Sequence, residues 1–181
     1  QYNGSGSSQY ASYTGNYYAF PWASGAGGLF VNKNLLDSFN LTVPNTTDEL
    51  IAQYQTVAPN GSPVRSGVYP MTFAGGNAMG YWLYMFDTLF AQYSGVEAED
   101  AFWKLTSVSD GYTVYQDEGI LQSLKIIEKV IDDDYCKNGS ALFSNEQSQK
   151  ELLNGNALYM CTGNWVYNEM KLNYSSIVDN M

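Results

Sequence analysis

The chain of 181 residues contains no histidine. Histidine is the usual general base of serine and cysteine nucleophilic enzymes and a frequent zinc ligand. Its absence therefore excludes Ser-His-Asp and Cys-His catalysis, the histidine-based metal motifs of helices and most zinc sites. An enzyme built on this sequence would have to use carboxylates, lysine, tyrosine or an unaided serine or cysteine.

Cysteine is nearly absent and occurs only at Cys136 and Cys161. Neither belongs to a Cys-x-x-Cys motif, so a thioredoxin-like redox site or a zinc site has little support. Two alternatives remain open for this pair. In an exported protein they are candidates for a disulfide, whose closed loop is worth roughly 3 kcal/mol in the chain-entropy model; otherwise they are buried free thiols.

Positive charge is scarce, with 8 Lys and Arg against 18 Asp and Glu and a formal net charge of −10. Phosphates and anionic lipids repel such a chain, which argues against nucleic acid and membrane surfaces as partners. The solubility of a secreted protein explains the same acidity more simply. No apolar run reaches the ~18–20 residues of a membrane span, so we expect no membrane insertion by this segment.

One acidic stretch, DDDYCKNG at residues 132–139, has some features of a calcium-binding loop. Its spacing fails, because Cys136 occupies a position that needs an oxygen ligand and no Glu closes the loop. We interpret the stretch as a solvated helix end, and we expect neither a metal nor a cofactor.

Apolar and aromatic residues are abundant: the chain is 45% hydrophobic and 15% aromatic, with 16 Tyr, 8 Phe and 4 Trp. This composition excludes a disordered chain and favours a globular unit that buries roughly 70% of its unfolded surface. Tyrosine-rich surfaces are typical of carbohydrate or protein binding, because the ring has an apolar face and a polar tip. The sequence begins at Gln1 without an initiating Met or signal peptide and stops at Met181 without a closing element, so we expect a piece of a longer protein.

Composition divides the chain into two parts. Residues 1–16 are mostly Gly, Ser, Gln, Asn and Tyr, which predicts a flexible arm or loop. Residues 17–181 contain no linker or internal repeat and predict a single, mostly helical lobe of α+β class with a few short strands. The expected strands are 17–22, 28–32, 68–73 and 157–161, and the expected helices are 33–39, 46–57, 77–93, 97–105, 117–133, 144–153 and 165–172.

Local signals support several of these helices. Capping boxes mark two starts, Thr46 with Glu49 and Ser144 with Gln147. Residues 77–93 are apolar on nearly every side, which predicts a helix inside the domain. Residues 117–133 have the clearest amphipathic pattern, with one apolar stripe made of Ile120, Leu121, Leu124, Ile127, Val130 and Ile131.

The first candidate ligand site follows the last expected strand, at Gly163, Asn164 and Trp165. Here a buried strand ends, a small residue turns the chain and a helix starts. Backbone amides at such a start can bind hydroxyls or anions, and the indole could stack on a sugar ring. The structural alternative is that Gly163 or Asn164 caps the helix and Trp165 anchors the core.

Aromatic residues near the N-terminus form a second candidate wall. Tyr18 and Trp22 belong to a strand-like run that ends beside a Ser/Gly bend, and packing in the core is the alternative for both. Asn77 and Trp82 stand at the start of the apolar helix 77–93. We expect Asn77 to cap that helix and keep it as a candidate ligand group.

Three segments in this order resemble the family 1 extracellular solute-binding proteins of bacterial ABC sugar importers. The first joins YAFP at residues 18–21 to GGLFVNK at 27–33. The second is PNTTDEL at residues 44–50, a Pro-x-Thr-x-x-Glu-Leu helix start. The third is LLNGNALYM at residues 152–160, followed by the Gly-x-Trp turn at 163–165.

The resemblance implies a type II periplasmic-binding-protein-like fold, in which two lobes close on a ligand, and this chain would be the second lobe. It also implies ABC permease subunits as partners, and a protein that is anchored to the cell surface as a lipoprotein or is periplasmic. In the family, the Gly-x-Trp turn and the aromatic hinge strand commonly line the cleft. Trp165, Asn164, Tyr18 and Trp22 match those positions, whereas Val31 departs from the tyrosine that the family often has.

We therefore predict a binding protein for a mono- or oligosaccharide, without chemistry of its own. The first alternative is a fragment of a secreted glycan-active hydrolase that uses carboxylates, whose two members can lie far apart in sequence. The second is a eukaryotic glycan-recognition or adhesion module, which the several Asn-x-Ser/Thr sequons would suit.

Overall fold

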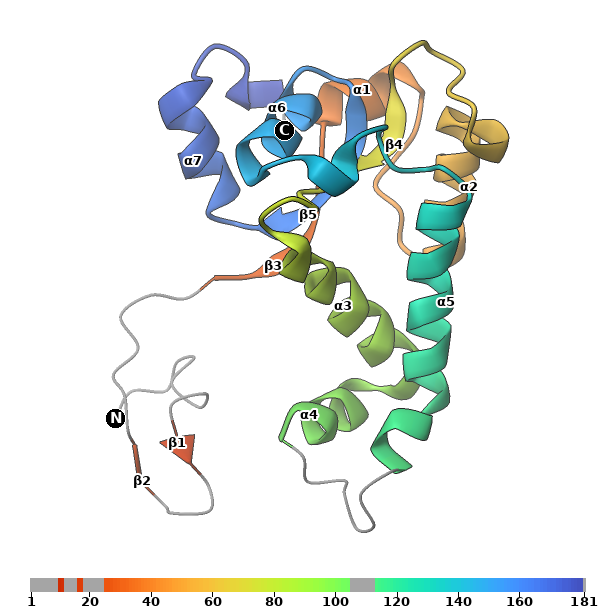
Figure 1. Ribbon diagram of the computed structural model, residues 1–181, viewed down its shortest axis with the longest axis vertical. Coiled ribbons are helices and arrows are strands. Elements are labelled where there is room, and N and C mark those ends of the chain that lie inside the picture. Colours follow the sequence, from red (N-terminus) through yellow and green to blue (C-terminus); the bar gives the residue numbers. More distant parts are fainter. Residues whose placement is uncertain (1–9, 12–15, 18–24, 105–112, 181) are drawn as a thin grey trace.

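The computed structural model describes residues 10–11, 16–17, 25–104 and 113–180 (Figure 1). Near the N-terminus, β1 (Tyr10–Ala11) pairs antiparallel with β2 (Asn16–Tyr17). The strand expected at residues 17–22 lies, beyond Tyr17, outside the described residues. The division of the chain into an arm and a lobe at residue 16 stays a prediction.

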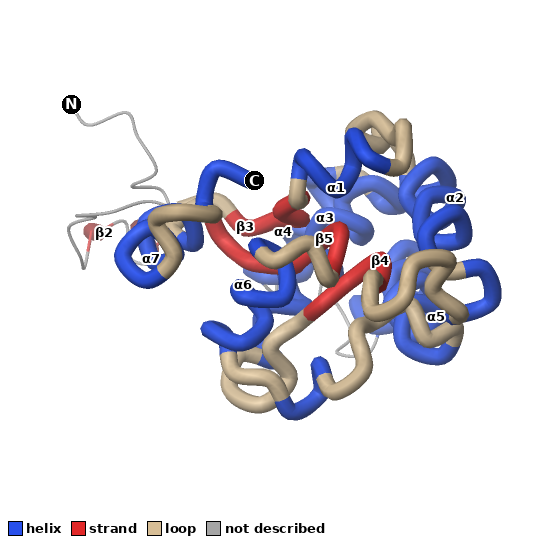
Figure 2. The backbone as a smooth tube through the Cα atoms, turned by 90° about the horizontal axis from the view of Figure 1, so that it is seen from above, coloured by secondary structure: helices blue, strands red, loops and turns tan. Residues whose placement is uncertain are grey.

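A three-stranded sheet forms the centre of the fold (Figure 2). Its strands are β3 (Gly27–Val31), β4 (Tyr69–Thr72) and β5 (Ala157–Gly163), in the order β3-β5-β4. The middle strand, β5, runs antiparallel to β3 and parallel to β4. All seven residues of β5 are buried, which explains why its sequence is apolar on both faces.

Helices cover both faces of this sheet (Figures 1 and 2). Tyr159 and Cys161 of β5 point into the main core, which α2, α3 and α5 enclose. Phe30 of β3 packs on the opposite side, against the smaller core of α6 and α7. The expected α+β, predominantly helical fold is confirmed. The α-helices are α1 (Lys33–Ser38), α2 (Thr47–Val57), α3 (Trp82–Ser94), α4 (Val96–Lys104), α5 (Glu118–Asp132), α6 (Asn145–Leu153) and α7 (Val166–Asn173), and the 3-10 turns are η2 (Pro59–Gly61), η3 (Met79–Tyr81), η4 (Thr113–Gln116), η5 (Ser140–Leu142) and η6 (Val178–Asn180).

The two predicted capping boxes differ in the structure. At α6 the box is complete, because Ser144 and Gln147 each bond the other's backbone amide. At α2 the Thr46 hydroxyl accepts from the Glu49 amide at 3.1 Å, as predicted. The Glu49 carboxylate, however, accepts from the amide of Asn45 at 2.6 Å, one residue before the cap. The N-terminus of α2 is thus stabilised, but the second half of its box was predicted wrongly.

The prediction of a fully buried helix over residues 77–93 was wrong in two respects. The chain first makes the 3-10 turn η3, so the α-helix begins only at Trp82. Met85, Phe86, Leu89 and Phe90 are buried, but Leu83 on the other side is half exposed. The helix is therefore half buried, because only one side of it meets the sheet and α5.

The apolar stripe predicted for α5 is also only partly covered. Ile120 and Val130 are buried, whereas Leu121, Leu124 and Ile131 are about half exposed. The stripe is wider than the surface that α3 and the sheet cover. Among the residues that the structure describes, no helix is long and apolar enough to cross a membrane.

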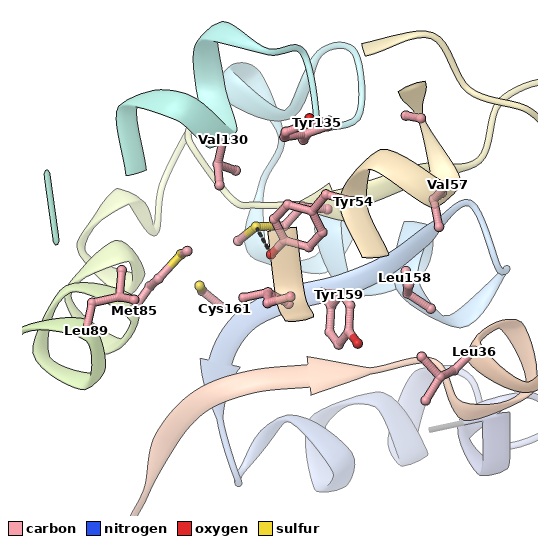
Figure 3. Packing of buried hydrophobic residues seen from close by; sticks show 13 residues of the cluster. Leu36, Tyr54, Val57, Met85, Leu89, Val130, Tyr135, Leu158, Tyr159 and Cys161 are labelled. Atoms are coloured by element: carbon pink, nitrogen blue, oxygen red, sulfur yellow. Dashed lines mark hydrogen bonds between the residues drawn. The ribbon is translucent and has the colours of Figure 1, made fainter. Parts of the chain in front are cut away.

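Tyrosines at the centre of the main core contact one another (Figure 3). The ring of Tyr54 lies 5.5 Å from that of Tyr135 and 6.0 Å from that of Tyr159. The Tyr54 hydroxyl donates to the Met71 sulfur at 3.4 Å, and the Tyr159 hydroxyl donates to Oε1 of Gln53 at 2.6 Å. Burial raises the pKa of Tyr159 to about 12, so this phenol stays a hydrogen-bond donor in the folded protein.

Cys136 and Cys161 are both free thiols in the structure, which therefore contains no disulfide between them; Cys161 is buried, as the second alternative had it, whereas Cys136 is half-buried. Cys161 is fully buried in the main core, and Cys136 follows α5 at its edge. Burial raises the pKa of Cys136 to about 12 and that of Cys161 further. Both groups therefore remain protonated near neutral pH.

We expect both thiols to react slowly with a disulfide reagent such as DTNB in the native protein and quickly after unfolding. The thiolate is the reactive form, and burial suppresses it in the native state only. Because the unfolded thiols ionise near pH 8.5 and the native ones do not, the free energy of unfolding should also fall as the pH rises above about 8.5. If the unfolded, unreduced protein had no thiol that reacts with DTNB, the two cysteines would form a disulfide and the assignment of free thiols would be contradicted.

Truncation of Leu158 on β5 should destabilise the fold strongly, since this side chain is completely buried. We expect Leu158→Ala to lower the free energy of unfolding by about 2–5 kcal/mol in urea titrations. The matched control is Leu142→Ala, where the side chain is 84% exposed and the expected change is within about 0.5 kcal/mol. Equal effects of the two substitutions would contradict the assignment of β5 to the core.

Candidate functional site

Three aromatic rings meet where β5 ends and α3 begins. Tyr81 ends the turn η3, Tyr84 lies in the first turn of α3, and Trp165 follows β5. Their ring centroids are 5.5 Å (Tyr81–Tyr84), 6.0 Å (Tyr84–Trp165) and 6.1 Å (Tyr81–Trp165) apart. All three residues are half-buried, so part of each remains accessible to solvent. We call Tyr81, Tyr84 and Trp165 the ring cluster.

Glycines lie directly beneath this cluster. A Cβ atom on Gly163 would stand 2.1 Å from the Trp165 indole, and one on Gly27 would stand 2.1 Å from the ring of Tyr84. A Cβ on Gly25 would approach Trp165 to 3.0 Å. The rings therefore rest on bare backbone at the ends of β3 and β5, which face each other in the sheet. Larger residues at these positions would push the rings away.

Asn164 joins the two strand ends beside the cluster. Its side-chain Oδ1 accepts from the Ala26 amide at 3.2 Å, and its own amide donates to the Ala26 carbonyl at 2.9 Å. Asn164 is therefore not the cap of α7, as one alternative had it. The N-cap of α7 is Trp165, which forms no side-chain capping bond. Asn164 instead holds the Gly-rich bend before β3 against the end of β5, and it remains exposed.

The predicted site residues fall into three groups, of which the third, Asn77 and Trp82, is described in the next paragraph. Gly163, Asn164 and Trp165 come together at the ring cluster. Tyr18 and Trp22 lie outside the described residues, so their place in the site stays a prediction.

Asn77 and Trp82 do not join the cluster through any described contact. The Asn77 side chain accepts from the amide of Asn145, the first residue of α6, at 2.8 Å. It therefore supports the start of α6, whose N-cap is Ser144, and does not cap the helix that follows it in sequence. Trp82 packs on Phe73 with ring centroids 5.1 Å apart and borders the main core. These contacts favour a structural role for Trp82.

Sequence reasoning missed Tyr81 and Tyr84. Both were assigned to one helix that seemed apolar on all sides, so nothing distinguished the exposed rings from the buried ones. Their spacing of three residues places them on the same side of the chain, and this was the only available signal. Partial burial, with Tyr81 as the next cause, raises the pKa of Tyr84, so its phenol is neutral at physiological pH and can donate and accept hydrogen bonds.

A cavity of about 370 Å³ opens beside the cluster, between β3, residues 43–47 and α3. Much of its lining is apolar, including Leu50 and Met85. Two of its polar groups bond within the protein: Thr47 Oγ1 to Gln92 Oε1 at 3.0 Å, and Thr88 Oγ1 to a backbone carbonyl of α3. Both hydroxyls thus have partners within the protein, and we take the ring cluster, which shares Tyr84 with this cavity, as the candidate site. Among the described residues, no group of three or more His, Cys, Asp or Glu is placed to hold a metal ion.

Comparison with known families places nearly the whole chain in one of them. The model of the family described as "Bacterial extracellular solute-binding protein" matches residues 2–180. The comparison with curated protein sequences found no match.

Several solved structures share the fold. A chitin oligosaccharide binding protein superposes with a TM-score of 0.74 at 19% identity, over 97% of this chain and 40% of that protein. The bacterial solute receptor AcbH, described as preferring β-D-galactopyranose, gives a TM-score of 0.67 at 22% identity, over 99% of this chain and 41% of the receptor. A sugar transporter protein from Bacillus licheniformis, in complex with stachyose, gives 0.68 at 14% identity, over 94% and 42%. This chain thus has the fold of part of a type II periplasmic-binding-protein-like structure and spans about two fifths of the length of these proteins.

The glycines under the rings allow a sharp test of the site's architecture. We expect Gly27→Ala to displace the Tyr84 ring, to change the near-UV circular dichroism and to cost about 1–3 kcal/mol of stability. Gly28→Ala is the matched control on the same strand, because its Cβ would meet nothing within 4 Å. Indistinguishable near-UV spectra for the two variants would contradict the contact between Gly27 and Tyr84.

Proposed function

This chain belongs to the bacterial extracellular solute-binding proteins, and we propose on that basis that it binds a carbohydrate for an ABC importer. The observation that carries the proposal is the ring cluster, whose Tyr84 and Trp165 rings pack directly on Gly27 and Gly163. A sugar presents flat C–H faces that pack on aromatic rings, and hydroxyls that need hydrogen-bond partners. The cluster supplies the rings, and the neighbouring phenols and strand ends supply polar groups.

Each residue has a distinct role in this proposal. Trp165 is the stacking platform, and Tyr84 and Tyr81 orient it and offer phenol hydroxyls. Asn164 and the backbone of Gly163 hold the strand ends at the spacing that the platform needs.

Four further residues are assigned by position. Tyr18 and Trp22 would form the facing aromatic wall at the hinge. Asn77 and Trp82 support the loop and helix that carry Tyr81 and Tyr84, through the hydrogen bond from Asn145 at the start of α6 and the packing against Phe73.

The chain would act as the second lobe of a two-lobe protein. The solved structures it resembles are more than twice its length, and their names mention chitin oligosaccharide, β-D-galactopyranose and stachyose. We propose that closure of the two lobes on the sugar presents the loaded protein to permease subunits at the outer side of the membrane, by surface anchoring or from the periplasm. The role is binding without chemistry, and membership in a family of binding proteins favours it over the hydrolase alternative.

Calorimetric titration of the full-length gene product with a panel of sugars tests this function. We expect at least one sugar to bind, and Trp165→Ala to weaken it about tenfold or more, which corresponds to about 1.4 kcal/mol. The matched control is Tyr93→Ala, because Tyr93 is a 45% exposed aromatic residue on α3 without a place in the ring cluster. Failure to bind any sugar, or equal affinities for Trp165→Ala and Tyr93→Ala, would overturn the proposal.

A further inference from the structure

An exposed aromatic ring on α4 lies beside α3. Trp103, near the end of α4, is 49% exposed although its ring is held from two sides. Its Nε1–H donates to Oδ1 of Asp87 at 3.1 Å, and the ring of Phe102 meets it edge-on at 5.1 Å. Phe102 in turn packs on Phe86 and Phe90 of α3. A large ring that is both fixed and half exposed is pre-organised to stack on a ligand.

Asp87 connects this ring to the ring cluster. Tyr84 and Asp87 are three residues apart on α3, so their Cβ atoms lie about 5–6 Å from each other on the same side of the helix. Tyr84 contacts Trp165 at one end, and Asp87 bonds Trp103 at the other. These two contacts and the three-residue spacing link Trp165, Tyr84, Asp87 and Trp103 in series along α3, and we call these four residues the strip. Helix α3 itself runs from the sheet toward α4 (Figure 1).

Two carboxylates accompany Trp103. Partial burial raises the pKa of Asp87, and it raises that of Glu99, with the charge of Asp87 as the next cause. The salt bridges among the described residues involve Asp37, Asp133 and Glu151, and neither Asp87 nor Glu99 takes part in them. Carboxylates accept hydrogen bonds from sugar hydroxyls and repel anionic ligands.

We propose that Trp103 is a second stacking platform and that the strip from Trp165 to Trp103 binds a neutral oligosaccharide. A single sugar would reach only one platform, whereas a longer chain would occupy both. This inference rests on the proposed carbohydrate function and adds to it the length and the charge of the ligand.

The test is a calorimetric length series on the full-length protein. The probes are galactose, raffinose and stachyose, together with chitin oligosaccharides of one to four units. We expect affinity to rise at least tenfold from the single sugar to the longest member of the series that binds. Trp103→Ala should remove that increase and leave the affinity for the short sugar within twofold. Tyr93→Ala should leave the whole series unchanged.

A second measurement does not depend on whether the Trp103→Ala variant folds. Oxidation of the unsubstituted protein by N-bromosuccinimide, followed by mass spectrometry of the Trp103 peptide, reports the accessibility of this indole. We expect the longest bound oligosaccharide to protect Trp103 and the single sugar to leave it reactive. An oligosaccharide of uronic acids should bind at least tenfold more weakly than a neutral one of equal length, and Asp87→Asn should reduce that difference.

The outcomes separate the two proposals. If no sugar of any length binds, the carbohydrate function fails and this inference fails with it. If sugars bind but affinity does not depend on length, or if Trp103 is oxidised equally with and without the long ligand, only the second platform is overturned. Protection of Trp103 in the ligand-free full-length protein would show that another part of the protein covers it, which also overturns the inference.

Discussion

The pairing of β5 between β3 and β4 is the constraint on which the remainder of the structure depends. Because all seven residues of β5 are buried, its side chains have to serve both cores at once. Tyr159 and Cys161 enter the core beneath α2, α3 and α5, while the smaller core of α6 and α7 packs behind the sheet. The antiparallel register with β3 then sets Gly163 opposite Gly27. The floor of the ring cluster is therefore a consequence of how the core strand is paired.

In the candidate site, the rings pack on rigid glycine backbone and remain partly accessible to solvent. Trp165 and Tyr84 lie on glycine backbone, so no side chain intervenes between the rings and the ends of the sheet. Such close packing fixes the rings, and their half-buried state leaves surface for a ligand. The low content of charged side chains, 14% of the residues, is compatible with a surface that presents aromatic groups. The net charge of −10 keeps such a surface soluble and makes it a poor partner for anions.

Local chemistry predicted a large part of the fold. The helix starts at Thr46 and Ser144 were foreseen because capping is a matter of a few neighbouring residues. The strand at 157–161 was foreseen because a short run that is apolar on both faces suits a central strand. The predictions were wrong where the role or the exposure of a side chain depends on residues that are distant in sequence and close in space. Asn77 bonds the first amide of α6 across 68 residues of sequence, and α5 has a wider apolar stripe than its neighbours cover.

In the candidate site, too, some features follow from local sequence and others from tertiary contacts. The sequence alone was sufficient to place Gly163, Asn164 and Trp165 at the end of a buried strand, because the strand, the turn and the helix start are contiguous. It was also sufficient to recognise the family, through motifs in a fixed order. It did not indicate that the rings of Tyr81 and Tyr84 meet Trp165 or that Trp103 bonds Asp87, since apolar residues look alike until their neighbours are known. Tertiary structure alone decided which rings are buried in the core and which remain accessible. The physical reason is that exposure depends on the packing of α3 against β3, α4 and α5, and these segments are brought together only by folding.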